Sequence, residues 1–257
     1  MTGCRAASTL IPMDIVDLRE FYGSRLGLTT RRLLANRLKP SMPPAPGATV
    51  LGIGYATPYL AEIAAEARRV LAFMQARQGV AAWPEEGWVR AALVDECDLP
   101  LLESSVDLAL VIHGLELTDA PGEMMKELWR VLAPQGRLLL VVPNRRGLWA
   151  RFDNTPFGHG QPFSRPQLSG LLREHQFEVV NWSPALFVPP HGGGVALSSA
   201  AILETLGARV APAVSGVIVV EAIKQVYALA SGKRARRLMP RLNPVLLPGP
   251  VPARREG

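Results

Sequence analysis

Residues 49–58 read TVLGIGYATP, and this stretch decides the class of fold. Its first six residues are apolar or glycine apart from one threonine, which is typical of a short buried strand. Thr57 can cap a helix through its hydroxyl, and Pro58 suits the first helical position, where its missing N–H costs nothing. The stretch therefore predicts a buried strand, a tight glycine turn and a helix in direct succession.

The same alternation of strand and helix continues along the chain. Further strands are predicted at residues 70–74, 89–94, 106–112, 136–143, 177–182 and 214–221. Helices are predicted at residues 57–68, 121–132, 164–175 and 198–210. Near-continuous apolar strands that alternate with helices indicate a parallel sheet covered on both faces, so the predicted fold class is a doubly wound α/β sandwich.

The chain is expected to have two further segments around this α/β domain, which spans residues 48–231. Residues 14–38 carry apolar side chains at helical spacing, and two glycines are expected to divide them into two helices, the second capped by Thr29 or Thr30. This N-terminal helical cap, residues 1–39, is followed by a proline-rich linker at 40–47. Residues 232–257 hold five prolines without periodicity and are expected to be a disordered tail.

The charge of the chain is concentrated in that tail. The net charge is +6, and residues 232–257 carry seven basic side chains against one acid, so the remainder is balanced. This argues against a basic nucleic-acid-binding domain. Cys4 and Cys97 form neither a disulfide framework nor a zinc-type pattern, so no metal site is predicted and a reducing, cytoplasmic location is expected. No secretory signal or membrane-spanning run is expected either.

A ligand site is expected where the strands end. In a doubly wound sheet, ligands bind outside the carboxyl ends of the strands, at the point where the strand order reverses. The predicted strand ends are Gly54, Met74, Asp95, His113 and Asn144. A dinucleotide site would require a third glycine in the first turn and an acid at the end of the second strand; Thr57 and Met74 stand there instead, which disfavours a nicotinamide cofactor.

The order of elements resembles the class I S-adenosylmethionine (SAM)-dependent methyltransferases, in particular the small-molecule group called type 11. Residues 50–60, VLGIGYATPYL, look like the first motif of that family. Residues 95–108 resemble its acidic loop and fourth strand, and residues 127–138, ELWRVLAPQGRL, its passage from a helix into the fifth strand. The resemblance implies a seven-stranded, mostly parallel sheet whose last strand is antiparallel, and SAM as the cofactor.

The cofactor motif departs from the family pattern. The family usually has acids where Gly52 and Met74 stand, and glycines where Ala56 and Pro58 stand. The acid at the end of the second strand usually binds the ribose hydroxyls of SAM, and each lost charge-assisted hydrogen bond would cost about 1.5–3 kcal/mol. Either altered contacts hold SAM, or the pocket has lost it. The cofactor-binding residues that the resemblance implies are Gly52, Gly54, Tyr55, Ala56, Met74, Asp95, Glu96 and His113.

Two histidines are candidates for catalysis. Methyl transfer from a sulfonium mainly requires alignment and exclusion of water, and a base is needed only for poorly acidic acceptors. Residues 143–163 are long, aromatic and rich in Gly and Pro, which is typical of a lid over a pocket. His159 lies between two glycines of this lid and is the predicted acceptor-facing base, and His113 follows the fourth strand. A surface-loop role for His159 and a packing role for His113 are the alternatives.

The sequence thus predicts a SAM-dependent methyltransferase with a small or medium acceptor. The alternative is a catalytically silent methyltransferase-like protein that binds a protein partner. Methylation of nucleic acid guided by the basic tail is the least favoured of the three. Acceptor choice is expected to depend on residues 14–38, 144–163 and 185–197, since specificity in such folds resides in caps and inserted loops.

Overall fold

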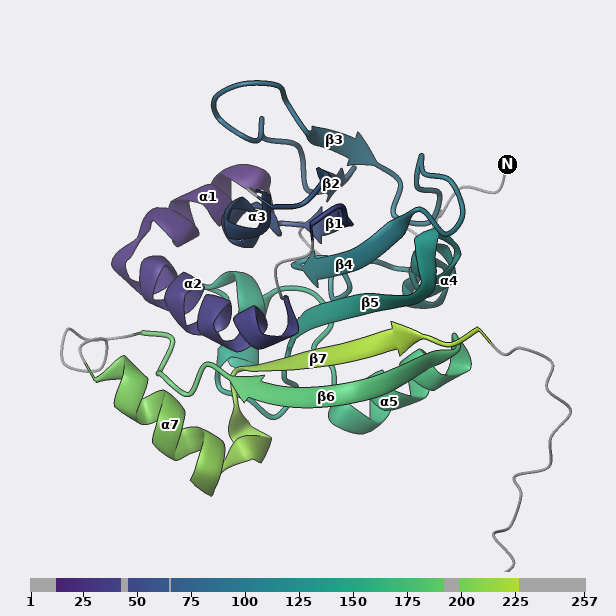
Figure 1. Cartoon of the computed structure of the whole chain (residues 1–257). Helices are drawn as coiled ribbons and strands as arrows, with labels where there is room; N and C mark the ends of the chain where they lie inside the picture. Colours follow the sequence, from purple (N-terminus) through teal and green to yellow (C-terminus); the bar gives the residue numbers. More distant parts are fainter. Residues whose placement is uncertain (1–12, 43–45, 65, 192–198, 227–257) are drawn as a thin grey trace, which may run out of the picture. The chain divides into compact units, whose positions relative to one another are not determined.

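A seven-stranded sheet forms the centre of the fold (Figure 1). The computed structural model describes residues 13–42, 46–64, 66–191 and 199–226, so the predicted tail and part of the predicted 185–197 loop lie outside the described residues. The strand order is β3-β2-β1-β4-β5-β7-β6. The strands are β1 Thr49–Gly54, β2 Arg69–Gln75, β3 Ala91–Val94, β4 Val106–Ile112, β5 Leu132–Pro143, β6 Phe177–Ala185 and β7 Val217–Lys224.

The topology places a switch point at the ends of β1 and β4. β1 pairs in parallel with β2 on one side and with β4 on the other, and Gly54 lies opposite Ile112. β7 runs antiparallel to both of its neighbours, β5 and β6, while the other pairs are parallel. The doubly wound, seven-stranded, mostly parallel sheet predicted from the sequence is confirmed.

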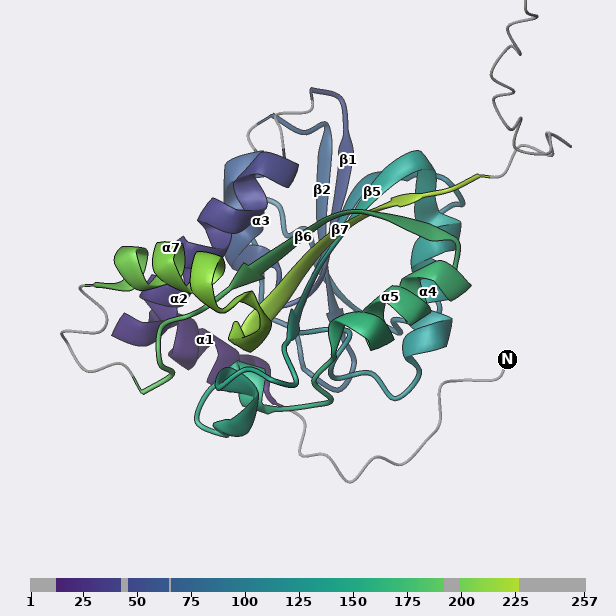
Figure 2. The ribbon, with the colours of Figure 1, turned by 90° about the horizontal axis from the view of Figure 1, so that it is seen from below.

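Helices cover both faces of the sheet (Figure 2). One face carries α1 Ile15–Gly23, α2 Arg25–Leu38, α3 Thr57–Ala64 and α7 Ala200–Val210, and the other carries α4 Pro121–Val131 and α5 Arg165–Glu174. Four 3-10 turns complete the described elements: η1 Lys39–Ser41, η2 Trp149–Arg151, η3 Pro156–Gly158 and η4 Pro212–Val214. Among the described helices, none has the length and apolarity needed to cross a bilayer.

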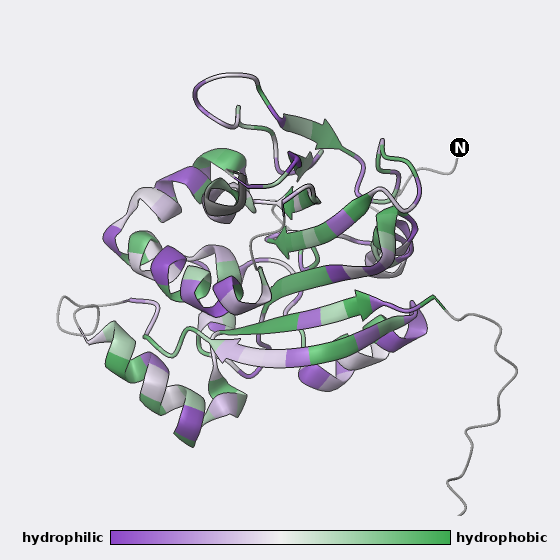
Figure 3. Ribbon diagram, viewed as in Figure 1, coloured by the Kyte–Doolittle hydropathy of each residue, from purple (hydrophilic) through white to green (hydrophobic). Residues whose placement is uncertain are grey.

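Alternating side chains of each central strand pack against the two helical layers. In β4, Leu110 and Ile112 belong to the cluster beneath α1, α2 and α3, whereas Ala109 and Val111 belong to the cluster beneath α4 and α5. In Figure 3, β4, β5 and β7 are mostly hydrophobic along their length. Burial on both faces explains why these strands have apolar runs rather than alternating patterns.

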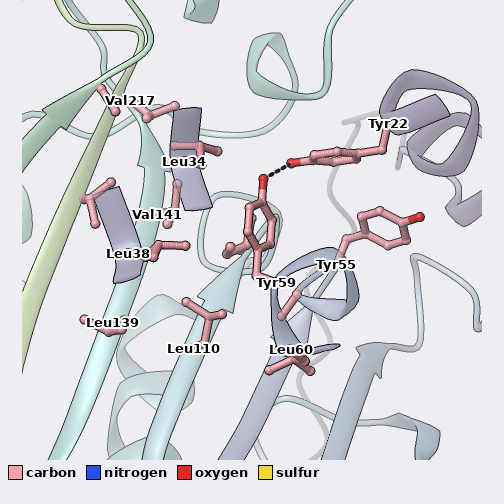
Figure 4. Packing of buried hydrophobic residues seen from close by; sticks show 14 of the residues in the cluster. Tyr22, Leu34, Leu38, Tyr55, Tyr59, Leu60, Leu110, Leu139, Val141 and Val217 are labelled. Carbon is pink, nitrogen blue, oxygen red and sulfur yellow. Dashed lines mark hydrogen bonds between the residues drawn. The ribbon is translucent and has the colours of Figure 1, made fainter. Parts of the chain in front are cut away.

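Helices α1 and α2 pack directly on the sheet. Leu34 and Leu38 of α2 are fully buried and lie beside Val141 of β5 and Val217 of β7 (Figure 4). At the end of this segment, Ser41 donates a 2.5 Å hydrogen bond to Glu221 of β7. The described residues between 13 and 226 belong to one compact unit, which includes the predicted cap.

Several predicted boundaries are wrong by a few residues. The second helix begins at Arg25, because the Ser24 hydroxyl accepts a hydrogen bond from the Gly27 N–H, and neither Thr29 nor Thr30 is the cap. β5 begins at residue 132 rather than 136 because Leu132 pairs with Val106 of β4. α3 ends at residue 64, β3 begins at residue 91, and β7 lies three residues later than predicted. α5 begins at residue 165, where Ser164 and Gln167 form a capping box.

Candidate active site

The turn after β1 is fixed against the end of β4. Gly54 has a φ of +75°, and a Cβ on it would lie 2.3 Å from the carbonyl oxygen of Ile112. The next residue, Tyr55, donates its backbone N–H to that same oxygen at 2.8 Å. Only glycine satisfies both the backbone conformation and the close approach, so this position keeps the glycine of the predicted turn.

Tyr22, in the last turn of α1, lies on this turn (Figure 4). Its ring centroid is 5.3 Å from that of Tyr55 and 6.2 Å from that of Tyr59. Its hydroxyl lies 2.9 Å from Nε2 of His113 and accepts a 3.3 Å hydrogen bond from Tyr59. Burial, and then the neighbouring Tyr59, raise the pKa of Tyr22 well above its ordinary value, so this hydroxyl stays protonated.

His113 is enclosed from the other side by the predicted lid. The ring of Phe157, in η3, lies 4.6 Å from the His113 ring, between centroids. The backbone carbonyl of His113 accepts a 2.7 Å hydrogen bond from Gln78. His159 instead bonds the carbonyl of Asp153 within its own loop. The segment therefore reaches His113 through Phe157, and the structure does not bring the two candidate histidines together.

The backbone at His113 is strained. Its φ is +52°, in the left-handed region that is uncommon outside glycine, although asparagine, aspartate and histidine adopt it more often than other residues. Such a conformation costs about 1–3 kcal/mol and persists where surrounding contacts hold it, often at functional sites. It places the imidazole next to Glu116, whose Oε1 is 3.3 Å from Nδ1. Both residues are about 1% exposed.

Buried oxygens without hydrogen-bond donors surround this histidine. Neither carboxylate oxygen of Glu116 accepts a hydrogen bond, and the side-chain oxygens of Gln75 and Gln78 lack donors as well. Gln75 and Gln78 follow β2, and Glu116 follows β4. A buried acceptor without a donor costs about 1–3 kcal/mol, and more for a charged group. A ligand that offers N–H or O–H donors and a positive charge would satisfy this set.

Met74 and Gly52 stand where the family usually has acids, and both positions are tightly packed. Met74 is fully buried, and its sulfur accepts the N–H of Ala81 at 3.3 Å. A Cβ on Gly52 would lie 2.6 Å from Leu60 and 2.8 Å from the Cβ of Ala56, so an acid does not fit at this position. At both positions, packing contacts with neighbouring residues therefore stand in place of an acidic side chain.

The acidic loop after β3 lies next to a separate small cavity. Asp95 accepts the N–H of Cys97 at 2.9 Å, which turns the carboxylate toward its own loop. Asp95 and Glu96 line a cavity of about 110 Å³ together with Ala76, Arg77 and Asp119. Gly54, Tyr55 and His113 are thus brought together, while Asp95 and Glu96 line a different cavity.

The sequence matches the model of a known protein family. A model described as a methyltransferase domain matches residues 29–181, more than half of the chain. The chain belongs to this methyltransferase domain family. The matched range of the methyltransferase domain includes every residue named above around Gly54 and His113 except Tyr22. No curated protein matches the chain.

Solved structures share the fold of the methyltransferase domain. A SAM-dependent methyltransferase from Archaeoglobus fulgidus is 17% identical, with a TM-score of 0.56 over 81% of this chain and 98% of that chain. A putative methyltransferase in complex with the Trm112 activator from Haloferax volcanii is 14% identical, with a TM-score of 0.56 over 82% and 98%. The [4+2]-cyclase SpnF is 18% identical, with a TM-score of 0.54 over 87% and 100%. At these identities, the likeness establishes the fold alone.

SAM is the cofactor that this family supports. It carries a sulfonium and an ammonium charge together with ribose and adenine donors, which fit the unpaired oxygens of Gln75, Gln78 and Glu116. The usual ribose acid is absent at Met74. His113 and Glu116 are almost completely buried. The donors and charges of the cofactor fit the chemistry of these residues, and the rings of Tyr22 and Phe157 pack against His113.

Sequence reasoning missed Tyr22 as a site residue. Tyr22 belongs to the apolar pattern of residues 14–38, which indicates only a buried helix face. Two successive aromatic residues, Phe21 and Tyr22, at the end of that helix were the available signal. It does not say which part of the sheet they meet.

Proposed function

We propose that the protein is a SAM-dependent methyltransferase of a small or medium acceptor, which receives its cofactor beside Gly54 and His113 once Tyr22 leaves the cleft. The observation that carries this proposal is the buried carboxylate of Glu116, whose oxygens accept no hydrogen bond and lie beside Nδ1 of His113, at 3.3 Å. Because His113 supplies a positive charge only when it is protonated, this buried carboxylate gains from a further cation. A cationic nucleoside beside Glu116 would provide that charge.

Different residues around the cleft would bind different parts of the cofactor. When bound, SAM supplies an electrophilic methyl group on its sulfonium. Glu116 would face the positive charge of the cofactor. Gln75 follows Met74 at the end of β2, and its unpaired amide oxygen would accept from the ribose in place of the missing acid. An uncharged acceptor forms weaker hydrogen bonds than a carboxylate, so we expect modest affinity.

His113 is placed to accept a proton from the acceptor. Its Nε2 faces the hydroxyl of Tyr22, and its Nδ1 lies beside Glu116. When Tyr22 leaves, Nε2 becomes free toward the cleft, while the carboxylate orients the ring from behind. Phe157 covers the ring and excludes water. This arrangement serves acceptors that must lose a proton during transfer.

Opening the cleft reduces the affinity for the cofactor. Tyr22 is 6% exposed, and exposing a buried side chain of this size costs about 1.5–3 kcal/mol. A cost of about 1.4 kcal/mol lowers affinity tenfold, so the closed state weakens binding by tenfold to roughly a hundredfold or more. Substitutions that favour the open state should therefore tighten binding.

The test is calorimetric titration of the full chain with S-adenosylhomocysteine. We expect binding by the wild type, at least tenfold weaker binding by Glu116→Gln, and a change below twofold for Glu123→Gln, an exposed glutamate on α4. Equal affinity of Glu116→Gln and wild type would remove Glu116 from the cofactor site.

The second candidate is a catalytically silent methyltransferase-like protein that binds a protein partner. It is favoured by the filling of the acid positions, since Leu60 and Ala56 close on Gly52 and Met74 already bonds Ala81. The Haloferax methyltransferase is in complex with its activator, which shows a partner role for a protein of this fold. If neither wild type nor Tyr22→Ala binds SAM or S-adenosylhomocysteine at 5 mM, the first function fails and the second is the one left to test.

A further inference from the structure

A second cavity lies at the same edge of the sheet as the cleft, on the face that carries α5. It has a volume of about 330 Å³, at the lower end of the range for small-ligand sites. Its walls come from the end of β5, the start of α5, the end of β6, and the residues from η4 into β7. Tyr22, Gly54 and His113 do not line it.

The cavity is positively charged. Arg146 and Arg165 both line it, and its lining includes no carboxylate. Across the described ranges, neither arginine forms an ion pair with an acid. The guanidinium of Arg165 lies 4.9 Å from the ring centroid of Trp182, a cation–π distance that holds it at the wall. An anion between the two guanidinium groups would be paired with both.

The remaining walls are partly apolar and are held together by hydrogen bonds. Trp182, Pro184 and Ile218 provide an apolar side, and serines also line the cavity. The buried Asn144 joins the other walls: its amide donates to the carbonyls of Ala213 at 3.0 Å and Ser215 at 2.8 Å. Its oxygen also accepts the N–H of Arg146 at 3.2 Å. A site whose walls are already fixed loses little entropy when a ligand binds.

We infer that this cavity binds a small organic anion, with a planar apolar body against Trp182 and Ile218 and one carboxylate or phosphate between Arg146 and Arg165. The site is separate from the cofactor cleft and does not depend on methyl transfer. It gives the protein a second small-molecule site on the opposite face of the sheet.

The experiment compares three probes of one shape by calorimetry on the full chain: 2-naphthoate, 2-naphthyl phosphate and neutral 2-naphthamide. We expect at least one of the two anions to bind, and the amide to bind at least tenfold more weakly. The carboxylate and phosphate arms identify which anion the site takes. The site is overturned if neither anion binds at 5 mM, or if the amide binds equally well.

Variants locate the binding. Arg146→Gln and Arg165→Gln should each weaken anion binding about tenfold or more, and both positions are exposed, so the fold tolerates the change. Arg145→Gln is the matched control, since this neighbouring arginine does not line the cavity and bonds the carbonyl of Pro162. Equal binding by Arg146→Gln, Arg165→Gln and Arg145→Gln contradicts the site, as does competition by S-adenosylhomocysteine.

Discussion

The hydroxyl of Tyr22 lies 2.9 Å from Nε2 of His113, although the two residues are 91 positions apart in the chain. The contact joins α1, which precedes the matched range 29–181, to the carboxyl end of β4. Tyr22 is thus supplied by a segment outside the family match. Under the proposed function, the packing of α1 controls access to the cofactor site.

Tyr22→Phe should lower stability and tighten cofactor binding. The change keeps the ring but removes the partner of a buried His113 nitrogen, which should cost about 1–3 kcal/mol in the free energy of unfolding. Because the closed state loses this energy and the open state does not, we expect S-adenosylhomocysteine to bind more tightly. Urea unfolding and calorimetric titration measure the two effects.

Tyr55→Phe is the control for this substitution. Tyr55 packs against the same ring, at 5.3 Å between centroids, and its hydroxyl has no hydrogen bond to a described residue. Its removal should leave the free energy of unfolding nearly unchanged. If Tyr22→Phe and Tyr55→Phe behave alike, the hydroxyl of Tyr22 does not hold the cleft closed.

Glu116→Gln should be at least as stable as the wild type without ligand. The substitution keeps the shape and removes a buried carboxylate that accepts no hydrogen bond and has Nδ1 of His113 beside it, an ion pair only when the imidazole is protonated. Glu127→Gln should instead lose about 1.5–3 kcal/mol in the free energy of unfolding, because Glu127 is bonded by Arg130 as well as by the Leu99 N–H. Urea unfolding of both variants tests the contrast, and a large loss in Glu116→Gln would show that its charge is compensated.

Gly54→Ala should destabilise the fold by more than about 2 kcal/mol, since the new Cβ meets the Ile112 carbonyl at 2.3 Å in a positive-φ conformation. Gly170→Ala offers the opposite case within helix α5, where a Cβ has open space, and should stabilise by about 0.5–1 kcal/mol. Thermal unfolding of the two variants measures both changes. Similar melting temperatures would contradict the close packing at the turn.

Glu204→Gln should stabilise the protein at neutral pH but not in acid. Burial raises the pKa of Glu204 above its ordinary value, against smaller opposing effects of the Phe187 N–H and Arg37. The folded state therefore favours the protonated form, so the stability due to this group is full below its ordinary pKa of about 4.3 and is lost as pH rises through the raised value. Glutamine does not ionise, so its advantage should be present at pH 7 and shrink below about pH 4. An advantage that stays constant with pH in urea unfolding would contradict this.

The bounds of a strand could be predicted from the sequence where the burial of its own residues determines them. β1 and β4 have the predicted bounds, because strands covered on both faces are apolar runs that end at turn residues. β5 was predicted too short, since its first residue, Leu132, is recruited by pairing with Val106. Pairing between distant segments leaves no trace in a local pattern.

The same limit applies to the site. Topology alone placed Gly54 and His113 at the switch point, and the absence of an acid at Met74 was readable directly. Tyr22 and Phe157 reach His113 from separate segments, and their arrival depends on how α1 and the 144–163 segment pack. The assignment of His159 as the acceptor-facing base remains a prediction.

Ser24 separates α1 from α2 with a single extended residue, which ends one helix and caps the next. Beyond it, α2 is fastened by Leu34, Leu38 and the Ser41–Glu221 bond. Ser24 is therefore the position about which α1 would turn relative to α2. Such a rotation would carry the nine residues of α1 outward as one unit and remove Ile15, Leu18 and Tyr22 from the core, while the contacts of α2 with the sheet stay in place.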